Sequence, residues 1–334
     1  MNIILEINNN YNMDCLEGLK LLDDNSIDSI VTDPPYELGY KNNKWDKTKI
    51  TYNELLWQEC FRVLKPGSHM FVFGSTKTFH RVACIIENIN FELRDTFQWL
   101  YSSGMAKNLN AGRAIEATIL TGGSSPTQLA IAREMTNQSV PLEKNYGMKK
   151  SYDKNTKQGI TKNKPNTEWI LSTKEGIKWD GWGNSLKPSY EPILLFRKPF
   201  SEKTMAENIL KWGVGALNIP NCKINNKYPA NIIIDENIEK YLDEVYSNFI
   251  KCFYCAKVSK KERGEGNNHP TVKPLSLIKY LITLVTPPNG ICLDPFEGSG
   301  THIVACKELG FNYIGFEKDT TYCDIINKRT QDIV

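Results

Sequence analysis

The sequence predicts an α/β fold in which a mostly parallel sheet is covered by helices on both faces, with a separate region inserted into it. Short apolar strands alternate with helices in residues 1–118 and again in residues 269–334, the pattern of a parallel sheet. Residues 119–268 lose this alternation and are rich in Gly, Asn, Lys and Ser up to about residue 180. We therefore expect the two outer regions to complete one sheet around an insertion.

In the first region, apolar strands are separated by helices. Strands are expected at 27–32, 69–73 and 93–101, and helices at about 51–64 and 76–87. Thr51 and Glu54 form a capping box that would open the first of these helices, and Lys65-Pro66-Gly67 would end it.

The alternation returns at Pro274, after the insertion. Helices are expected at 274–285, at 301–309 and at the end of the chain, and strands at 291–294 and 313–317. Within the insertion, one apolar run near 192–197 is typical of a core strand. We expect this run to join the sheet although the residues around it do not.

The composition is that of a globular protein. The chain has 334 residues, 24% charged and 40% hydrophobic, enough to bury its own core. No segment has the length of a membrane span and the N-terminus lacks a signal-peptide pattern, so we expect a cytoplasmic protein with reduced cysteines. Cys252 and Cys255 are the only closely spaced cysteines. A single C-x-x-C is weak grounds for zinc, and no metal site is predicted.

Positive charge is concentrated in one segment of the insertion. The net charge of the whole chain is only +3, but residues 141–180 contain nine Lys against five Asp or Glu. A basic segment on a nearly neutral body suits a phosphate backbone, although a solvated loop has the same composition.

The tetrapeptide Asp33-Pro34-Pro35-Tyr36 follows the strand expected at 27–32. In α/β enzymes this position, at the carboxyl end of a strand, carries the chemistry. A carboxylate, a carbonyl held outward by rigid prolines and an aromatic face can together grip a flat ring with an exocyclic amine. The tetrapeptide therefore predicts an amine-binding site at this edge of the sheet.

A glycine turn follows the strand expected at 291–294. Gly298 and Gly300 stand between that strand and a helix, where glycine lets a ligand approach the backbone, and Glu317 ends the next strand, where an acid can accept from ribose hydroxyls. Neither G-x-G-x-x-G nor G-x-x-x-x-G-K-[ST] is present. The pattern indicates a nucleoside cofactor without a phosphate grip, such as S-adenosylmethionine.

Together, Asp33-Pro34-Pro35-Tyr36 and Asp294-Pro295-Phe296-Glu297-Gly298-Ser299-Gly300-Thr301 resemble the motifs of the amino-methylating DNA methyltransferases, the N6-adenine and N4-cytosine family. The motif order resembles the beta class of that family. The resemblance implies a Rossmann-like S-adenosylmethionine-dependent methyltransferase sheet, with a catalytic half at 1–118, a target-recognition insertion at 119–268 and a cofactor-binding half at 269–334.

The same resemblance implies which residues bind the cofactor. His269-Pro270-Thr271-Val272-Lys273-Pro274 is similar to the segment that wraps its methionine end, and Asn12-Met13-Asp14-Cys15 is similar to a segment near its adenine. The residues implied are Asp14, Cys15, His269, Thr271, Lys273, Asp294, Phe296, Gly298, Ser299, Gly300, Thr301 and Glu317. Glu297 departs from the family pattern, and we expect it to face solvent, the alternative being a bond to the methionine ammonium.

A mechanism follows from the chemistry of the amine. Adenine N6 is a poor nucleophile, and acceptance of its two N–H bonds by Asp33 and the Pro34 carbonyl would direct its lone pair toward the methyl group. A carboxylate with a reference pKa near ~3.9 cannot deprotonate the amine first, so attack precedes proton loss, to Asp33 or to water. Tyr36 would stack on a base flipped out of double-stranded DNA.

Several alternatives stay open at this point. Cytosine N4 is the closest alternative target, although Asp33 favours adenine because family members that methylate cytosine N4 more often have serine there. Cytosine C5 is excluded because the chain has no Pro-Cys pair. A catalytically silent DNA-binding or specificity subunit is the alternative of another class. The resemblance also implies a homodimer and a cognate restriction enzyme as partners, although no segment indicates an interface.

Overall fold

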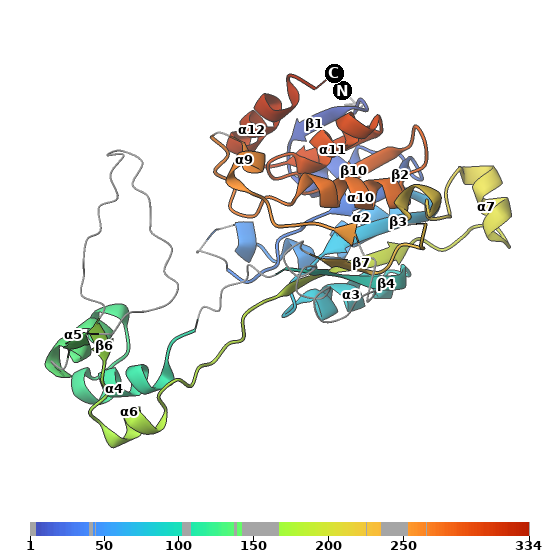
Figure 1. Ribbon diagram of the computed structural model, residues 1–334. Coiled ribbons are helices and arrows are strands. Elements are labelled where there is room, and N and C mark those ends of the chain that lie inside the picture. Colours follow the sequence, from blue (N-terminus) through green and yellow to red (C-terminus); the bar gives the residue numbers. More distant parts are fainter. Residues whose placement is uncertain are drawn as a thin grey trace. The chain divides into compact units, whose positions relative to one another are not determined.

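The computed structural model describes residues 5–39, 43, 45–101, 108–136, 139–141, 167–224, 226–234, 253–264 and 266–333 (Figure 1). The chain divides into two compact units. One, the sheet unit, comprises Met1–Ser103 and Ser189–Val334, and the other, the inserted unit, is Gly104–Pro188. The sequence places the insertion at 119–268, but residues after Ser189 belong to the sheet unit.

The sheet unit is built on a nine-stranded sheet in the order β1-β11-β10-β2-β3-β7-β4-β8-β9. Its strands are β1 Asn9–Asn12, β2 Ile27–Thr32, β3 Leu64–Phe73, β4 Glu92–Leu100, β7 Tyr190–Arg197, β8 Ile232–Ile234, β9 Phe253–Tyr254, β10 Ile291–Asp294 and β11 Asn312–Glu317. Strands from both outer regions of the chain pair directly, since β10 lies between β11 and β2. The prediction of one sheet formed by both regions is confirmed.

Strand β7 confirms the prediction that the run near 192–197 joins the sheet. It lies between β3 and β4 and is antiparallel to both, whereas the other pairs of the sheet are parallel. Because of this reversed direction, the amino end of β7 lies at the edge where the parallel strands have their carboxyl ends.

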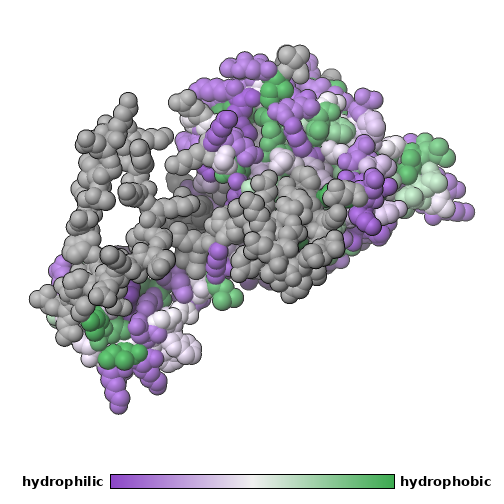
Figure 2. All heavy atoms as spheres, viewed as in Figure 1, coloured by the Kyte–Doolittle hydropathy of each residue, from purple (hydrophilic) through white to green (hydrophobic). Residues whose placement is uncertain are grey.

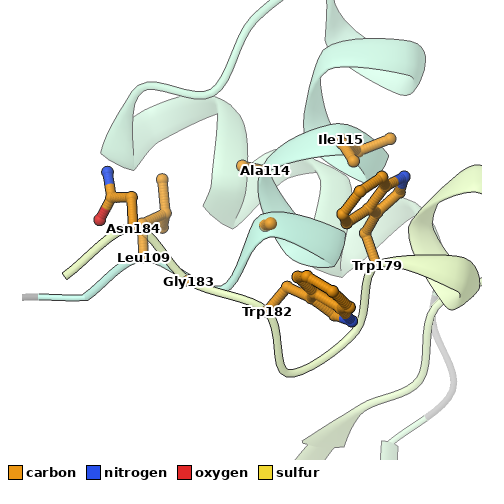
Figure 3. A pocket seen from close by; sticks show the side chains of 8 residues that line it. Leu109, Ala114, Ile115, Trp179, Trp182, Gly183 and Asn184 are labelled. Carbon is orange, nitrogen blue, oxygen red and sulfur yellow. The ribbon is translucent and has the colours of Figure 1, made fainter. Parts of the chain in front are cut away.

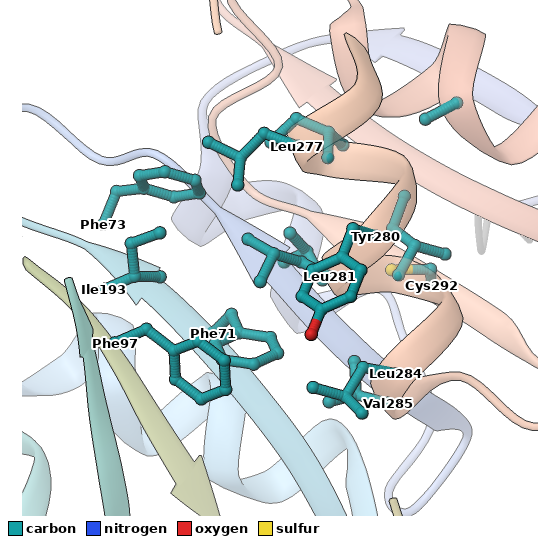
Figure 4. Packing of buried hydrophobic residues seen from close by; sticks show 14 of the residues in the cluster. Phe71, Phe73, Phe97, Ile193, Leu277, Tyr280, Leu281, Leu284, Val285 and Cys292 are labelled. Atoms are coloured by element: carbon teal, nitrogen blue, oxygen red, sulfur yellow. The ribbon is translucent and has the colours of Figure 1, made fainter. Parts of the chain in front are cut away.

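Helices cover both faces of the sheet, as predicted. The α-helices of this unit are α1 Cys15–Lys20, α2 Glu54–Val63, α3 Phe79–Asn88, α7 Met205–Trp212, α9 Lys260–Arg263, α10 Leu275–Val285, α11 Thr301–Leu309 and α12 Thr320–Thr330, and the 3-10 turns are η2 Trp45–Lys47, η3 Ile50–Tyr52 and η4 Pro220–Cys222. Side chains alternate along β3. Phe71 belongs to the hydrophobic cluster that includes residues of α10 and α11, and Figure 4 shows it facing α10. Met70 belongs to the other cluster, which includes residues of α1, α2 and α3.

The capping box predicted at Thr51 and Glu54 is wrong. Helix α2 begins at Glu54, and its N-cap is Asn53, whose side chain accepts from the Leu55 amide. The Thr51 hydroxyl instead donates to the Pro35 carbonyl at 2.6 Å. The residues have the spacing of a capping box, but the Thr51 hydroxyl bonds to the tetrapeptide and does not cap the helix.

Among its described residues, the inserted unit contains three helices and an antiparallel pair of short strands. These are α4 Ala111–Thr121, α5 Pro126–Thr136, α6 Lys174–Lys178, β5 Ser139–Pro141 and β6 Thr167–Trp169. Helices α4 and α6 approach closely, since a Cβ on Gly112 would lie 2.4 Å from the Gly176 carbonyl oxygen. Most of the basic segment, residues 142–166, lies outside the described residues.

The surface of the sheet unit carries one exposed apolar helix. Figure 2 shows hydrophobic residues gathered over α7, where Leu210 is 87% exposed and Met205 is 50% exposed. Among the described residues, no helix is long and apolar enough to cross a bilayer. Of the closely spaced cysteines, Cys255 is buried and Cys252 lies outside the described residues.

Candidate functional site

The two sequence motifs meet at one edge of the sheet. Asp33 follows β2, Asp294 ends β10 and Glu317 ends β11, and these three strands are neighbours that run parallel. The Thr32 hydroxyl donates to Asp294 Oδ1 at 2.7 Å, which joins the motifs directly. This edge is the candidate site, because the carboxyl ends of parallel strands are where α/β proteins bind ligands.

The two carboxylate oxygens of Asp33 have different surroundings. One carboxylate oxygen, Oδ2, accepts from Lys273 Nζ at 2.5 Å. The other, Oδ1, is shielded from solvent and has no hydrogen-bond partner among the described residues. Burial raises the pKa of Asp33 above its usual value, and the Lys273 ammonium opposes that shift. Asp33 thus presents one unoccupied acceptor atom.

The tetrapeptide is held rigidly by its neighbours. Pro35 and Tyr36 carbonyls accept from the Thr51 and Thr78 hydroxyls, at 2.6 and 3.1 Å. The Pro34 carbonyl accepts no hydrogen bond from any residue that the structure describes. Two predicted acceptors of the amine, Asp33 Oδ1 and the Pro34 carbonyl, are therefore both available.

Glu191 is a functional residue that the sequence reasoning missed. It accepts from the Tyr36 hydroxyl at 3.1 Å and lies 3.4 Å from Lys273 Nζ and 3.7 Å from Lys257 Nζ. Lys257 in turn sits 3.5 Å from the centroid of the Tyr101 ring. The only signal was an acid directly before an apolar run, and its place at this edge follows from the reversed direction of β7, which the sequence does not reveal.

Lys273 contacts the tetrapeptide Asp33–Tyr36. The resemblance placed it in the cofactor segment, and in the structure its ammonium reaches Asp33 Oδ2 and the Tyr36 hydroxyl, the latter at 3.2 Å. Burial alone lowers the pKa of a lysine, but here the carboxylates of Asp33 and Glu191 outweigh it and the pKa of Lys273 is raised. The buried ammonium is therefore charged and acts as a counterion for both acids.

The other residues of that segment lie beside the glycine turn. The His269 ring is stacked with Trp45, contacts Tyr322 edge-on, and borders Gly298. Burial lowers the pKa of His269 to about 4, so the ring is neutral at neutral pH. Thr271 is exposed, and its amide donates to His269 Nδ1 at 3.4 Å.

The glycine turn has the backbone geometry that the sequence predicts. Gly298 and Gly300 have φ values of +56° and +79°, and a Cβ on Gly300 would lie 2.8 Å from Ile326. The amides of Gly298 and Asp319 donate to the two oxygens of Glu317, at 2.8 and 2.7 Å. Burial raises the pKa of Glu317 to about 7.

Three further residues predicted to bind the cofactor make contacts that hold the glycine turn in place. Asp294 is buried, and its Oδ1 accepts from the Phe296 amide at 2.9 Å, so it shapes the turn. Ser299 and Thr301 lie against Arg329, whose Nη1 donates to the Ser299 carbonyl at 2.5 Å. These contacts fix the conformation of the turn.

Asp14 and Cys15 lie next to Glu317, because β1 pairs with β11 and Asn12 is the partner of Glu317 in the register. Asp14 caps α1 by accepting from the Leu16 amide at 3.0 Å, and Lys318 Nζ lies 3.0 Å from its other oxygen. Cys15 is buried at the first position of that helix. The structure thus places both residues at the sheet edge, and their proximity to an adenine stays a prediction.

The expectation that Glu297 faces solvent is wrong. Its side chain is buried, and Oε1 lies 2.5 Å from His302 Nδ1. Helix α11 begins at Thr301, so His302 on its first turn reaches back under the loop. The expectation was based on the motif residues alone and did not include His302, five residues after Glu297.

The arrangement fits a nucleoside cofactor. The glycine turn holds its backbone at positive φ beside Glu317. Each oxygen of Glu317 that accepts one amide keeps a second lone pair for a ribose hydroxyl. The neighbouring Asp33 Oδ1 is a buried acceptor without a partner. These features together can hold a nucleoside beside an amine.

The chain belongs to the DNA methylase family of N6- and N4-methylating enzymes, whose sequence profile matches residues 27–328. It is an amino-methylating DNA methyltransferase, and S-adenosylmethionine is its cofactor.

Curated relatives cover nearly all of the chain. The Type II methyltransferase M.HindIII of Haemophilus influenzae is 28% identical over 96% of this chain and 94% of its own length. The Type II methyltransferase M.HinfI of Haemophilus influenzae is 24% identical over 96% of this chain and 67% of its own. Among solved structures, the M1.HpyAVI complex with S-adenosylmethionine has a TM-score of 0.49 and 19% identity, covering 96% of this chain and 98% of that one.

Proposed function

We propose that the protein methylates N6 of adenine within a short DNA sequence. The observation that carries this proposal is the unpartnered Oδ1 of Asp33, a buried acceptor beside the cofactor edge. A buried acceptor left without a hydrogen bond costs free energy, so its persistence favours a ligand that donates to it. An exocyclic amine is such a donor.

The tetrapeptide would bind the amine through two acceptors. Asp33 Oδ1 and the Pro34 carbonyl each accept one N–H, and the lone pair of the nitrogen is then directed away from both. The Lys273 ammonium, 2.5 Å from Asp33 Oδ2, opposes the rise in the pKa of Asp33 that burial causes and so favours the carboxylate form. Asp33 holds the amine during attack, and proton loss follows afterwards.

Tyr36 would stack on the target base. Its hydroxyl is fixed by Glu191 and Lys273, which leaves little rotational freedom to lose on binding. Stacking contributes on the order of 1–3 kcal/mol per base and helps offset the few kcal/mol needed to flip a base out of the duplex. Flipping is required because the amine of a paired base cannot reach this edge.

The cofactor would lie along the glycine turn. S-adenosylmethionine supplies an electrophilic methyl group when bound. Glu317 would accept from its ribose hydroxyls, the backbone at Gly298 and Gly300 would contact it closely, and Asp14 and Cys15 would border its adenine. The other residues in this proposed set are His269, Thr271, Lys273, Asp294, Phe296, Ser299 and Thr301.

The inserted unit would recognise the target sequence. It contains a cavity of about 330 Å³ lined by Leu109, Ala111, Ala114, Ile115, Trp179, Trp182, Gly183 and Asn184 (Figure 3). Trp182 is 62% exposed, and the basic segment belongs to the same unit. Aromatic and basic groups on one unit suit a nucleic acid. A homodimer and a cognate restriction enzyme remain proposed partners.

The test is the nucleoside content of DNA from a host that lacks adenine methylation. We expect expression of the wild-type chain to produce N6-methyladenine, detected by mass spectrometry, and Asp33→Asn to reduce it by at least about 10²-fold. Asp28→Asn is the matched control, because Asp28 lies on β2, is also buried and also pairs with a lysine, Lys65, at 2.6 Å.

The outcomes separate the alternatives. N4-methylcytosine in place of N6-methyladenine would establish the cytosine reaction. Cofactor binding by calorimetry without any methylated base would establish a silent subunit. Full methylation by a folded Asp33→Asn variant would contradict the role of the carboxylate.

A further inference from the structure

A cluster of metal-binding side chains lies behind the glycine turn, and the proposed function does not use it. Cys292 comes from β10, and His302 and Cys306 come from α11. All three are at most 3% exposed. One donor atom from each lies within 4.8 Å of the other two. The three side chains therefore already surround a common point.

The backbone explains why these residues converge. His302 and Cys306 are four residues apart on a helix and so point from the same face. Cys292 lies on the strand that leads into that helix through the glycine turn. Of the pair that the sequence analysis considered for zinc, Cys255 is not part of this cluster and Cys252 lies outside the described residues.

His302 is oriented as a metal-bound histidine is. Glu297 Oε1 holds Nδ1 at 2.5 Å, which directs Nε2 toward the thiols, and Cys306 Sγ lies 3.5 Å from Nε2. A carboxylate on the far nitrogen is the usual outer partner of a histidine ligand. In a tetrahedral site with a Zn–S distance of ~2.3 Å and a Zn–N distance of ~2.0 Å, the sulfur and nitrogen atoms lie roughly 3.5 Å apart. Cys306 Sγ and His302 Nε2 already have this separation.

A second observation is an unpartnered carboxylate oxygen beside the cluster. Glu297 Oε2 is shielded from solvent and has no hydrogen-bond partner among the described residues. A buried carboxylate that makes so few bonds is costly unless positive charge stands nearby. A divalent cation on the other side of the imidazole would supply that charge.

We propose that Cys292, His302 and Cys306 bind a thiophilic metal ion, Zn²⁺ in the first place, with Glu297 orienting the histidine. Two sulfurs and one imidazole nitrogen favour zinc and exclude Mg²⁺ and Ca²⁺, which take oxygen ligands. Both thiols lose their protons to solvent when the ion binds. The three side chains supply three of the four tetrahedral positions. The ion would tie β10 to α11 and so brace the turn between them.

The test is the metal content of the full-length protein, purified without a polyhistidine tag from zinc-supplemented cells and measured by plasma mass spectrometry. We expect about one zinc ion per chain, as in a structural site. Cys306→Ser should lose it by at least tenfold. Cys84→Ser, at an exposed cysteine of α3, and the double variant Cys252→Ser/Cys255→Ser should keep it.

Cobalt provides a second, spectroscopic readout of the site in the folded protein. Wild-type protein exchanged with Co²⁺ should show thiolate-to-cobalt charge-transfer absorption in the near ultraviolet, and the Cys252→Ser/Cys255→Ser variant should show the same band. Wild-type protein with less than about a tenth of an ion per chain, or a band abolished by Cys252→Ser/Cys255→Ser, would overturn the proposal. In that case Glu297 and His302 form only a buried ion pair.

Discussion

The sheet unit and the inserted unit differ in what their interiors contain. The sheet unit buries large side chains on both faces, among them Trp57, Phe71 and Phe196. The inserted unit buries small ones such as Ala117 and Ala132, and it exposes Trp182. Large buried side chains make many dispersion contacts and fix the backbone that carries them.

The difference indicates how each unit performs its part. Transfer chemistry needs atoms held within a fraction of an ångström, and a parallel sheet provides this at its carboxyl edge. Among the described residues of the inserted unit, buried polar contacts are prominent. The buried Glu116 carboxylate accepts from the amides and hydroxyls of both Ser172 and Thr173. Substitutions in the two units should therefore have different consequences.

Removing a positive or a negative charge next to Asp33 should have the largest effects on activity, and the two changes should shift the pKa of Asp33 in opposite directions. Lys273→Met removes the charge that lowers the pKa of Asp33, so the acid limb of the pH–rate profile should move to higher pH. Glu191→Gln removes a charge that raises this pKa, so the limb should move to lower pH. Asp33 acts as a carboxylate, so activity falls as pH drops through its pKa.

At neutral pH we expect Lys273→Met to lower kcat/KM on the order of 10²-fold, the effect of losing one oriented donor. Single-turnover methylation of a DNA duplex, measured across pH, checks both signs. If the two variants move the acid limb in the same direction, the titrating group is not Asp33.

Gly300→Ala should weaken S-adenosylmethionine binding by about 10–100-fold. Its φ of +79° and the 2.8 Å approach to Ile326 strain any side chain, and such strain costs on the order of 1–3 kcal/mol. Gly310→Ala is the matched control, because Gly310 has a φ of +73° but nothing within 4 Å of its Cβ position. Calorimetric titration measures both, and equal affinities in the two variants would contradict close approach at the turn.

Glu116→Ala should destabilise the inserted unit by about 2 kcal/mol while S-adenosylmethionine affinity stays unchanged, because four donors lose a buried charged partner. Burial opposes ionisation of Glu116, but the hydrogen bonds outweigh it and lower its pKa. The stabilisation is therefore present at neutral pH. It is lost as the pH falls below the pKa of a free glutamate. Hydrogen exchange of residues 108–136 gives the measurement, and unchanged protection would show that Glu116 does not hold the unit together.

Trp182→Ala should have the smallest effect, less than about 1 kcal/mol on unfolding, because the side chain is 62% exposed. Its ring contacts Trp179 edge-on, and that contact is the main one lost. Thermal unfolding supplies the test. A larger loss would mean that the inserted unit has a hydrophobic core after all, and the contrast with the sheet unit would weaken.

Local patterns were sufficient for much of the sheet unit. The expected strands overlap β2, β3, β4, β7, β10 and β11, because a buried strand is a short apolar run between turn residues. Gly298 and Gly300 were readable from the sequence, since positive φ requires glycine in any fold. The tetrapeptide was recognised because its four residue types stand next to each other in the chain.

The sequence by itself thus determined the family, the sheet and the two motifs, since each depends on residues close together in the chain. Only the tertiary structure decided that Glu191 and Lys273 surround Asp33, because the first depends on the direction of β7 and the second on a contact across 240 positions. It also decided that Glu297 is buried, and that Cys292, His302 and Cys306 converge. Charges interact through space, and the order of residues along the chain does not record which of them meet.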